Sequence, residues 1–305
     1  MSNTWVIFGA TGQQGGAVVR ALLQDTTLSK SITVRAAVRN PAAPTAKPLH
    51  DLGCEVVRAD LDDKDSLHAA FEGASGVFLV TSNNIDEQYY KREFQQGKNA
   101  ADASVESGVQ KIIFSTLPGV RTITNGHLTK VVHFDVKHDI EQYIRQLPIA
   151  SSFIALGSFM QNFINILPPR DAGDGTFAIK ASMPSSTVFP LIDATDSGRV
   201  VAQMVKAFDD LRSRTIYVAA QLNTLDEIAA SIGKANAKTV KYMQISPEEF
   251  LAPLPKPMAE DFGEFARYLS EYGYFGPETN TLPLGEFGQL TSYEEFLKEN
   301  DYMTL

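Results

Sequence analysis

Apolar residues follow two different spacings along the first half of the chain. Six short runs are rich in β-forming residues, and most of them are almost continuous in Val, Ile, Leu and Phe, which is typical of strands covered on both faces. The segments between them have apolar residues at helical spacing, as Val132, Val136 and Ile140 show. The expected strands are 4–8, 32–38, 55–58, 76–80, 111–114 and 150–155, and the expected helices are 14–23, 64–71, 87–107 and 130–145. This alternation predicts βαβ units and a parallel sheet.

The alternation ends near residue 157. The later strand-like runs are 176–180, 188–192 and 216–220, the helical patterns are 197–208 and 225–235, and 251–275 is rich in proline and aromatic residues. We therefore predict an α/β protein with a Rossmann-type doubly wound parallel sheet in residues 1–156. A smaller α+β C-terminal domain, for a substrate or a partner, is expected in residues 157–305. Segment 188–220 is expected to return to the first domain.

The composition is that of a folded soluble protein, because 44% of the 305 residues are hydrophobic and 21% are charged. The formal net charge of −9 opposes direct binding to nucleic acid, since that affinity comes from Lys and Arg on phosphate. Cys54 is the only cysteine, which excludes an intramolecular disulfide and Cys-rich metal sites. We expect no metal.

The first residues lack the charged and long apolar regions of a signal peptide. The uncharged stretch 147–169 is interrupted by prolines and polar side chains, so we expect a strand, a turn and a short helix there instead of a membrane span. The expected location is the cytoplasm, with the nucleus as a second compartment. The expected oligomeric state is a monomer or a homodimer.

A glycine-rich turn joins the first expected strand to the first expected helix. Gly9, Gly12 and Gly15 have the spacing that lets the backbone turn sharply, approach a pyrophosphate and pack the helix on the strand. The helix N-terminus then offers free N–H groups to the phosphates. A P-loop is excluded because no Gly-Lys-Ser/Thr follows at the required spacing. The turn therefore predicts a nucleotide site, with a plain tight turn as the alternative.

The end of the second expected strand indicates which dinucleotide is bound. An NAD site has Asp or Glu there, whereas this chain has Arg39-Asn40. An arginine can pair with the 2′-phosphate of NADP, and one charge-assisted bond contributes about 1.5–3 kcal/mol. The missing carboxylate also weakens a methyltransferase interpretation. We predict NADP(H) as the cofactor.

Two further strand ends are expected at the cofactor, because ligands bind beyond the carboxyl ends of parallel strands. Asp60-Leu61 would flank the adenine, and Thr81-Ser82-Asn83 would lie near the middle of the dinucleotide. Asp60 has an equally good alternative role as the cap of the helix that begins near Lys64.

With these residues assembled, the chain resembles the NmrA-like family of atypical short-chain dehydrogenase/reductase proteins, and within it the NADPH redox-sensor branch. The resemblance covers nearly the full length. Its marks are Phe8–Gly16, Val38–Pro41, Gln96-Gly-Lys98, His133-Phe-Asp-Val-Lys137 and Gly157–Asn162. It implies a Rossmann domain that binds NADP(H). The chain departs from related sensors at Ala42 and Ala43, where they have further basic residues.

The resemblance also implies which residues surround the cofactor. It places Lys137 at the nicotinamide ribose, and Phe159 and Asn162 at the nicotinamide end. Together with the turn and the strand ends, the expected cofactor-binding residues are Gly9, Ala10, Thr11, Gly12, Gln13, Gln14, Gly15, Arg39, Asn40, Asp60, Leu61, Thr81, Ser82, Asn83, Lys137, Phe159 and Asn162.

The catalytic pattern of a short-chain reductase is incomplete in this chain. Such enzymes use Tyr-x-x-x-Lys, in which Tyr donates a proton and Lys lowers its pKa. This sequence has His133-x-x-x-Lys137 instead. Lys137 and His133 are the candidate catalytic residues, although a lone histidine on an amphipathic helix more often serves packing. Ser115, at the end of the fifth expected strand, is either a polarising serine or a strand-end cap.

Two functions follow from these patterns. The first is an NADP(H) redox sensor and transcription regulator that acts through a regulatory protein partner, with segment 119–130 as its switch. The second is an NADPH-dependent oxidoreductase of a small carbonyl or enone substrate that uses Lys137. The missing tyrosine favours the sensor.

Overall fold

The chain is described here by a computed structural model that covers residues 3–81, 85–281 and 286–300. It forms two compact units, each assembled from three segments. The first unit contains Met1–Leu117, Val136–Ala155 and Thr195–Ile216, and the second contains Pro118–Asp135, Leu156–Ala194 and Tyr217–Leu305.

A seven-stranded sheet forms the centre of the first unit in the part of the chain that the structure describes. Its order is β11-β6-β5-β4-β1-β2-β3, and the strands from β3 to β6 all pair in parallel. The strands are β1 (Thr4–Ile7), β2 (Thr33–Val38), β3 (Glu55–Arg58), β4 (Ala74–Leu79), β5 (Lys111–Thr116), β6 (Ala150–Leu156) and β11 (Thr215–Val218). The chain order reverses between β1 and β4, which is where a doubly wound sheet binds its ligand.

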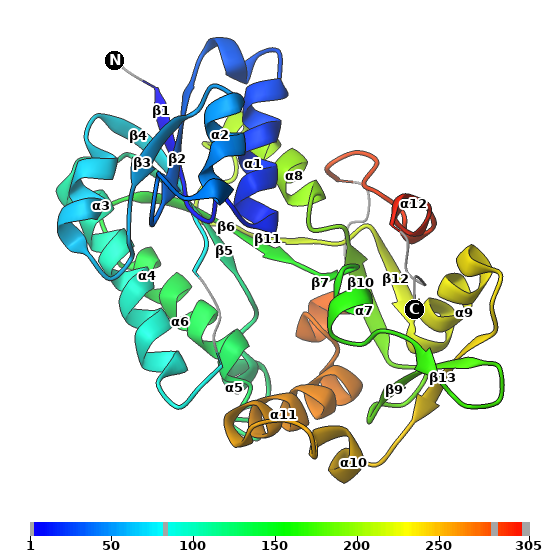
Figure 1. Ribbon diagram of the computed structural model, residues 1–305. Coiled ribbons are helices and arrows are strands. Elements are labelled where there is room, and N and C mark those ends of the chain that lie inside the picture. The colour runs from blue at the N-terminus through cyan, green and yellow to red at the C-terminus, as the bar shows by residue number, and fades with distance from the viewer. Residues whose placement is uncertain (1–2, 82–84, 282–285, 301–305) are drawn as a thin grey trace. The chain divides into compact units, whose positions relative to one another are not determined.

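Helices cover both faces of this sheet (Figure 1). Helix α1 (Gln13–Gln24) packs beside α8 (Asp196–Lys206), and α3 (Lys64–Phe71) packs beside α4 (Tyr89–Glu106). Helix α2 (Lys47–Asp51) connects β2 to β3 in the chain, and helix α6 (Val132–Arg145) lies between β5 and β6. Strands covered on both sides are buried along their length, as Val6, Val77 and Ile112 show at zero exposure. The predicted Rossmann-type fold class is confirmed.

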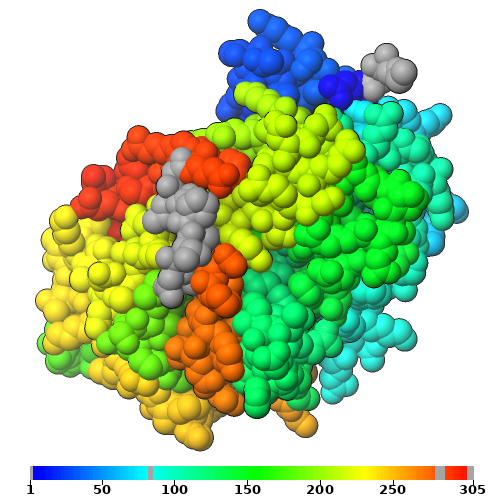
Figure 2. Space-filling view, turned by 180° about the vertical axis from the view of Figure 1, so that it is seen from behind, coloured from blue at the N-terminus to red at the C-terminus, as the bar shows by residue number. Residues whose placement is uncertain are grey.

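The segment after α8 closes one edge of the sheet. Ser213 N donates to Ser151 O, and Phe153 N donates to Arg214 O. Figure 2 shows this yellow-green segment against the green chain that carries β6. The first unit therefore incorporates a strand from a distant part of the sequence.

The described part of the second unit holds two small three-stranded sheets, ordered β12-β10-β7 and β13-β9-β8. Its strands are β7 (Ser158–Phe159), β8 (Arg170–Asp171), β9 (Phe177–Ala181), β10 (Val188–Ile192), β12 (Gln221–Thr224) and β13 (Val240–Gln244). Its helices are α5 (Val120–Ile123), α7 (Asn162–Asn165), α9 (Leu225–Asn236), α10 (Pro247–Leu251), α11 (Lys256–Tyr272) and α12 (Tyr293–Glu299).

Helix α11 was not expected from the sequence. Pro255 precedes it and Pro257 lies in its first turn, where a missing N–H costs nothing. Gly273, with φ of +80°, ends it. The expected strand, turn and short helix within 147–169 are confirmed as β6, the turn at 160–161 and α7, and the two-residue strand β7 before the turn was not expected. No helix in residues 3–81, 85–281 and 286–300 is long and apolar enough to cross a membrane.

Candidate functional site

The glycine-rich turn has the geometry of a close backbone approach. Gly9 has φ of +64°, in the left-handed region that favours glycine. A Cβ at Gly15 would lie 2.3 Å from Phe8 O, so any side chain there would collide with the end of β1. Gly12 caps α1 without a side-chain acceptor, and the first turn has no acidic residue. The exposed N-terminus of α1 is therefore open to an anion.

Ala10 and Gln14 support this turn from inside. Ala10 is buried, whereas Thr11 and Gln13 are exposed. Ser115 Oγ, at the end of β5, donates to Gln14 Oε1 at 2.8 Å. The Gln14 side chain thus ties the start of α1 to the neighbouring strand end, and Ser115 serves that contact.

The end of β2 is exposed and basic. Arg39 and Asn40 follow Val38 directly, and both are exposed. Asn40 Oδ1 accepts from Ala42 N at 3.0 Å, which forms the turn that carries the chain away from the sheet. Arg39 therefore lies at the carboxyl end of β2, which follows the glycine-rich turn and α1 in the chain.

Asp60 and Leu61 lie half-buried after β3. Asp60 Oδ1 accepts from Asp62 N at 3.1 Å, whereas the cap of α3 is Asp63, whose side chain accepts from Ser66 N. The alternative role of Asp60 as the helix cap is therefore wrong. Leu61 O accepts from the Asn99 amide at 2.9 Å, which holds this loop on α4.

A buried polar cluster lies at the end of β4. Lys137 Nζ, from α6, donates to Glu93 Oε1 of α4 at 2.7 Å and to Thr81 Oγ1 at 3.1 Å. The Thr81 hydroxyl also donates to Glu93 Oε1. The three residues are only 6%, 1% and 5% exposed. Ser82 and Asn83, which were also expected here, lie outside the described residues.

His133 has a different partner from Lys137, although both lie on α6. Its Nδ1 faces Oδ1 of Asp261, a fully buried residue of α11. The rings of Phe134, Phe262 and Phe265 surround the imidazole, with centroids 4.9 to 5.8 Å away. His133 thus lies in an aromatic cluster of the second unit.

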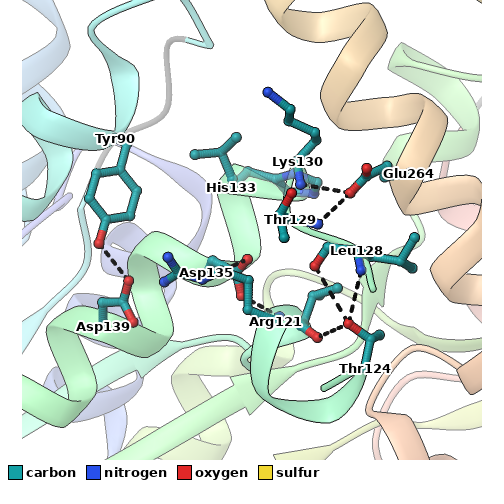
Figure 3. Close-up of polar contacts among 12 residues, drawn as sticks. Tyr90, Arg121, Thr124, Leu128, Thr129, Lys130, His133, Asp135, Asp139 and Glu264 are labelled. Atoms are coloured by element: carbon teal, nitrogen blue, oxygen red, sulfur yellow. Dashed lines mark hydrogen bonds and ion pairs between the residues drawn. The ribbon is translucent and has the colours of Figure 1, made fainter. Parts of the chain in front are cut away.

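Two carboxylates of α11 bind the backbone at and before the start of α6. Asp261 Oδ2 accepts from the amides of Val132 at 2.7 Å and His133 at 3.1 Å. Glu264 Oε2 accepts from the amides of Thr129 at 2.6 Å and Lys130 at 2.7 Å (Figure 3). Asp261 therefore caps α6 from another helix, and a negative charge there also suits the helix dipole.

Segment 119–130 is tied by its own polar contacts. The Thr124 hydroxyl donates to Val120 O at 2.8 Å and accepts from Leu128 N at 3.1 Å (Figure 3). The buried Asp135 carboxylate accepts from Arg121 N at 3.0 Å. These bonds close the segment into a compact loop.

The Gln96-Gly97-Lys98 mark packs α4 on α6. A Cβ at Gly97 would lie 2.7 Å from the Ile140 side chain, so the two helices approach closely. Lys98 Nζ donates to Asp102 at 2.7 Å and to the Tyr143 hydroxyl at 2.6 Å. The hydrogen bond to Asp102, and then that to Tyr143, raises the pKa of Lys98. Burial and the bond to Asp102 raise the pKa of Tyr143.

Phe159 and Asn162 belong to the second unit. Phe159 pairs with Ile192 in the β7–β10 ladder and is half-buried. Asn162 begins α7, and its amide donates to Ser158 Oγ at 3.5 Å. Within the described ranges no cluster of His, Cys, Asp and Glu has an arrangement that would hold a metal ion.

Sequence reasoning missed Glu93, Asp261 and Glu264. A signal for Glu93 exists, because Tyr89, Glu93 and Gly97 recur every four residues on the buried side of α4. An acidic residue in such a stripe needs a buried cation or donor. Asp261 and Glu264 had no comparable signal, since α11 itself was not expected.

A model of the NmrA-like family matches residues 1–297. An NmrA-like family domain-containing protein of Dictyostelium discoideum is 31% identical over 99% of each chain. An NmrA-like family domain-containing oxidoreductase of Aspergillus hancockii is 29% identical, over 89% of this chain and 84% of the relative.

Solved structures share the fold at lower identity. NmrA, a negative transcriptional regulator, in complex with NADP has a TM-score of 0.77 at 24% identity, over 98% of this chain and 95% of that one. A Citrobacter sp. triphenylmethane reductase complexed with NADP(H) has a TM-score of 0.77 at 23% identity, over 98% and 99%. The family model and the full-length relative together show that this chain belongs to the NmrA-like family.

Proposed function

We propose that the first unit binds NADP(H) at the carboxyl edge of its sheet. The observation that carries this proposal is the turn at Gly9–Gly15, where a Cβ at Gly15 would collide with Phe8 O and the α1 N-terminus lacks a side-chain acceptor. The pyrophosphate would accept from the backbone amides there. Solved structures of the same fold with NADP or NADP(H) bound support the assignment.

The preference for the phosphorylated cofactor would come from Arg39. It is exposed at the end of β2, where an NAD site has a carboxylate for the ribose 2′-hydroxyl. One charge-assisted bond to the 2′-phosphate corresponds to roughly a 10- to 100-fold preference for NADP over NAD.

Titration with NADP⁺, NADPH and NAD⁺ tests this proposal. Thermal stabilisation and calorimetry on the wild type should show binding of NADPH at a lower Kd than NAD⁺. Arg39→Ala should remove that preference, while Arg212→Ala, at an exposed arginine of the same unit, should keep it. Absence of stabilisation by any of the three nucleotides at saturation would falsify the proposal.

We further propose that the protein is a redox sensor that acts through a regulatory protein partner, with little dehydrogenase activity. Bound NADPH can supply a hydride, but a reductase also needs a group that moves a proton. Lys137 is ion-paired with Glu93, and His133 is bound to Asp261 within the second unit. The structural likeness to a negative transcriptional regulator is consistent with this role.

The sensor would signal through a change in its contacts when the cofactor is bound. Segment 119–130, with its exposed Asn125–His127, is the candidate switch. Limited proteolysis with and without NADPH should show slower cleavage in this segment when the cofactor is present. Unchanged cleavage there would count against the switch.

An NADPH-dependent oxidoreductase is the second candidate, because the relative from Aspergillus hancockii is named as one. The substrate would be a small carbonyl or enone compound, and Lys137 would act on it. NADPH oxidation should be followed over a panel of such compounds. Turnover that is lost in Lys137→Ala and kept in Lys91→Ala, at an exposed lysine of α4, would support the enzyme over the sensor.

A further inference from the structure

Lys137 is held by two groups from two other elements of the first unit. Glu93 Oε1 accepts from Lys137 Nζ at 2.7 Å and also from the Thr81 hydroxyl. Thr81 Oγ1 in turn accepts from Lys137 Nζ at 3.1 Å. The three side chains form a closed ring of hydrogen bonds, and each is at least nine-tenths buried.

The ring leaves Lys137 little freedom. A lysine ammonium has three N–H donors and no acceptor. Glu93 Oε1, Thr81 Oγ1 and, at the longer distance of 3.4 Å, Thr81 O accept hydrogen bonds from this ammonium, so its position is fixed. Thr81 follows β4 at the carboxyl edge of the sheet, where a doubly wound fold binds its ligand.

We propose that Glu93, together with the Thr81 hydroxyl, is a positioning residue that holds the Lys137 ammonium so that a hydroxyl of the nicotinamide ribose can replace its longest contact, the one to Thr81 O. This inference rests on the proposed binding of NADP(H). Glu93 itself touches no cofactor; it acts through Lys137. The arrangement makes Lys137 an anchor for the ribose, because a hydrogen bond from an ammonium is charge-assisted and stronger than one between neutral groups.

The alternative is that the ion pair of Glu93 and Lys137 only stabilises the fold. The chain contains a second buried carboxylate with similar partners, which serves as a matched control. Glu141 lies on α6, as Lys137 does, and is 5% exposed. It accepts from Arg145 at 2.7 Å and from the Thr215 hydroxyl at 2.7 Å. Its ring has the same chemistry as the Glu93 ring: a carboxylate, a cation and a threonine hydroxyl. It involves β11 at the edge of the sheet instead of the end of β4.

Calorimetric titration with two ligands tests the proposal. NADPH contains the nicotinamide ribose, whereas adenosine 2′,5′-bisphosphate has only the adenosine end with its 2′-phosphate. Glu93→Gln should raise the Kd for NADPH about tenfold and leave that for the bisphosphate within twofold. Lys137→Met should have the same effect, and the double variant should show no further loss. Glu141→Gln should bind both ligands as the wild type does.

Two more variants separate positioning from general damage. Thr81→Val should weaken NADPH binding severalfold, and Thr81→Ser should restore it, because only the hydroxyl is needed. Glu93→Gln that binds NADPH like the wild type would overturn this inference alone. A wild type that binds neither ligand would overturn the proposed function instead. Equal losses in Glu93→Gln and Glu141→Gln would favour a structural role for both pairs and also overturn the inference.

Discussion

His133 and Lys137 lie one turn apart on α6, yet they are bound to different halves of the protein. Lys137 pairs with Glu93 in the first unit, beside the end of a strand of the large sheet. His133 pairs with Asp261 in the second unit, among phenylalanine rings. The spacing resembles that of a catalytic dyad, but each member has its own buried carboxylate.

The two carboxylates also differ in what else they bind. Glu93 accepts from a threonine hydroxyl, which is a side-chain group. Asp261 accepts from two backbone amides at the start of α6. Substitution can remove a side-chain donor together with its acceptor, whereas backbone donors always remain. We therefore expect the first pair to be replaceable by neutral residues and the second not.

The largest expected effect is that of Asp261→Ala. It leaves two amides without an acceptor and His133 without its partner, and we expect the free energy of unfolding to fall by about 3–5 kcal/mol. Urea denaturation measures it. Glu260→Ala, at the exposed neighbouring position on α11, is the control and should cost less than about 0.5 kcal/mol. A loss below about 1 kcal/mol in Asp261→Ala would show that the cap contributes little.

Paired substitutions compare the Lys137–Glu93 pair with the His133–Asp261 pair directly. Lys137→Met alone leaves a buried carboxylate uncompensated, and adding Glu93→Gln should recover about 2 kcal/mol. His133→Leu combined with Asp261→Leu should recover nothing over Asp261→Leu, because the amides of α6 stay uncapped. Denaturation of the wild type, the four single variants and the two double variants gives both coupling energies. If both double variants regained the same free energy of unfolding, the two pairs would not differ in the way proposed.

The sheet of the first unit could be predicted almost completely from the sequence. Most of its strands are nearly continuous apolar runs, and even the edge strand β3 (Glu55–Arg58), with only two apolar residues, has the expected bounds. Strand β1 ends at Ile7, one residue earlier than expected, because the turn already begins at Phe8. These strands could be predicted because a parallel strand that is buried on both faces has apolar residues at consecutive positions.

Helix α11 shows why the second unit was harder to predict. Phe262, Phe265, Leu269 and Tyr272 have helical spacing, but three prolines, at positions 253, 255 and 257, come before them and obscure the start of a helix. Proline is compatible with a first helical turn, so α11 begins at Lys256 and includes Pro257.

The site was predictable only where its contacts are local. The glycine-rich turn closes within a few residues, so its geometry follows from the spacing of the glycines. Glu93 lies 44 positions from Lys137, and Asp261 lies 128 positions from His133. Such partners depend on the packing of separate elements, which a single sequence does not record. The roles of the expected cofactor-binding residues stay predictions.

Two helical glycines give a smaller contrast between the units. A Cβ at Gly97 would lie 2.7 Å from three atoms of the buried Ile140, whereas one at Gly263 would meet only the end of the Leu251 side chain at 3.1 Å. Gly97→Ala should therefore cost about 1–2 kcal/mol through overpacking. Gly263→Ala should be neutral or stabilising by up to about 1 kcal/mol, from helix propensity. Thermal denaturation distinguishes them, and Ile140→Val should partly rescue Gly97→Ala.

The smallest effect is expected at Glu264, the second carboxylate of α11 that binds the chain before α6. Its Oε2 accepts from the amides of Thr129 and Lys130, but both of these residues are exposed, so water can replace the carboxylate. Glu264→Ala should lower the free energy of unfolding by about 1 kcal/mol, the usual value of a lost cap.

Glu264→Gln keeps a carbonyl acceptor and should lose less than Glu264→Ala, and Glu271→Ala, at an exposed residue of the same helix, should lose less still. Amide hydrogen exchange gives the local readout, because only Glu264→Ala should speed exchange at Thr129 and Lys130. If those amides exchange at the wild-type rate in Glu264→Ala, the contact is incidental. Asp261 alone would then join α11 to the start of α6, and the difference between the His133 pair and the Lys137 pair would depend on that one carboxylate.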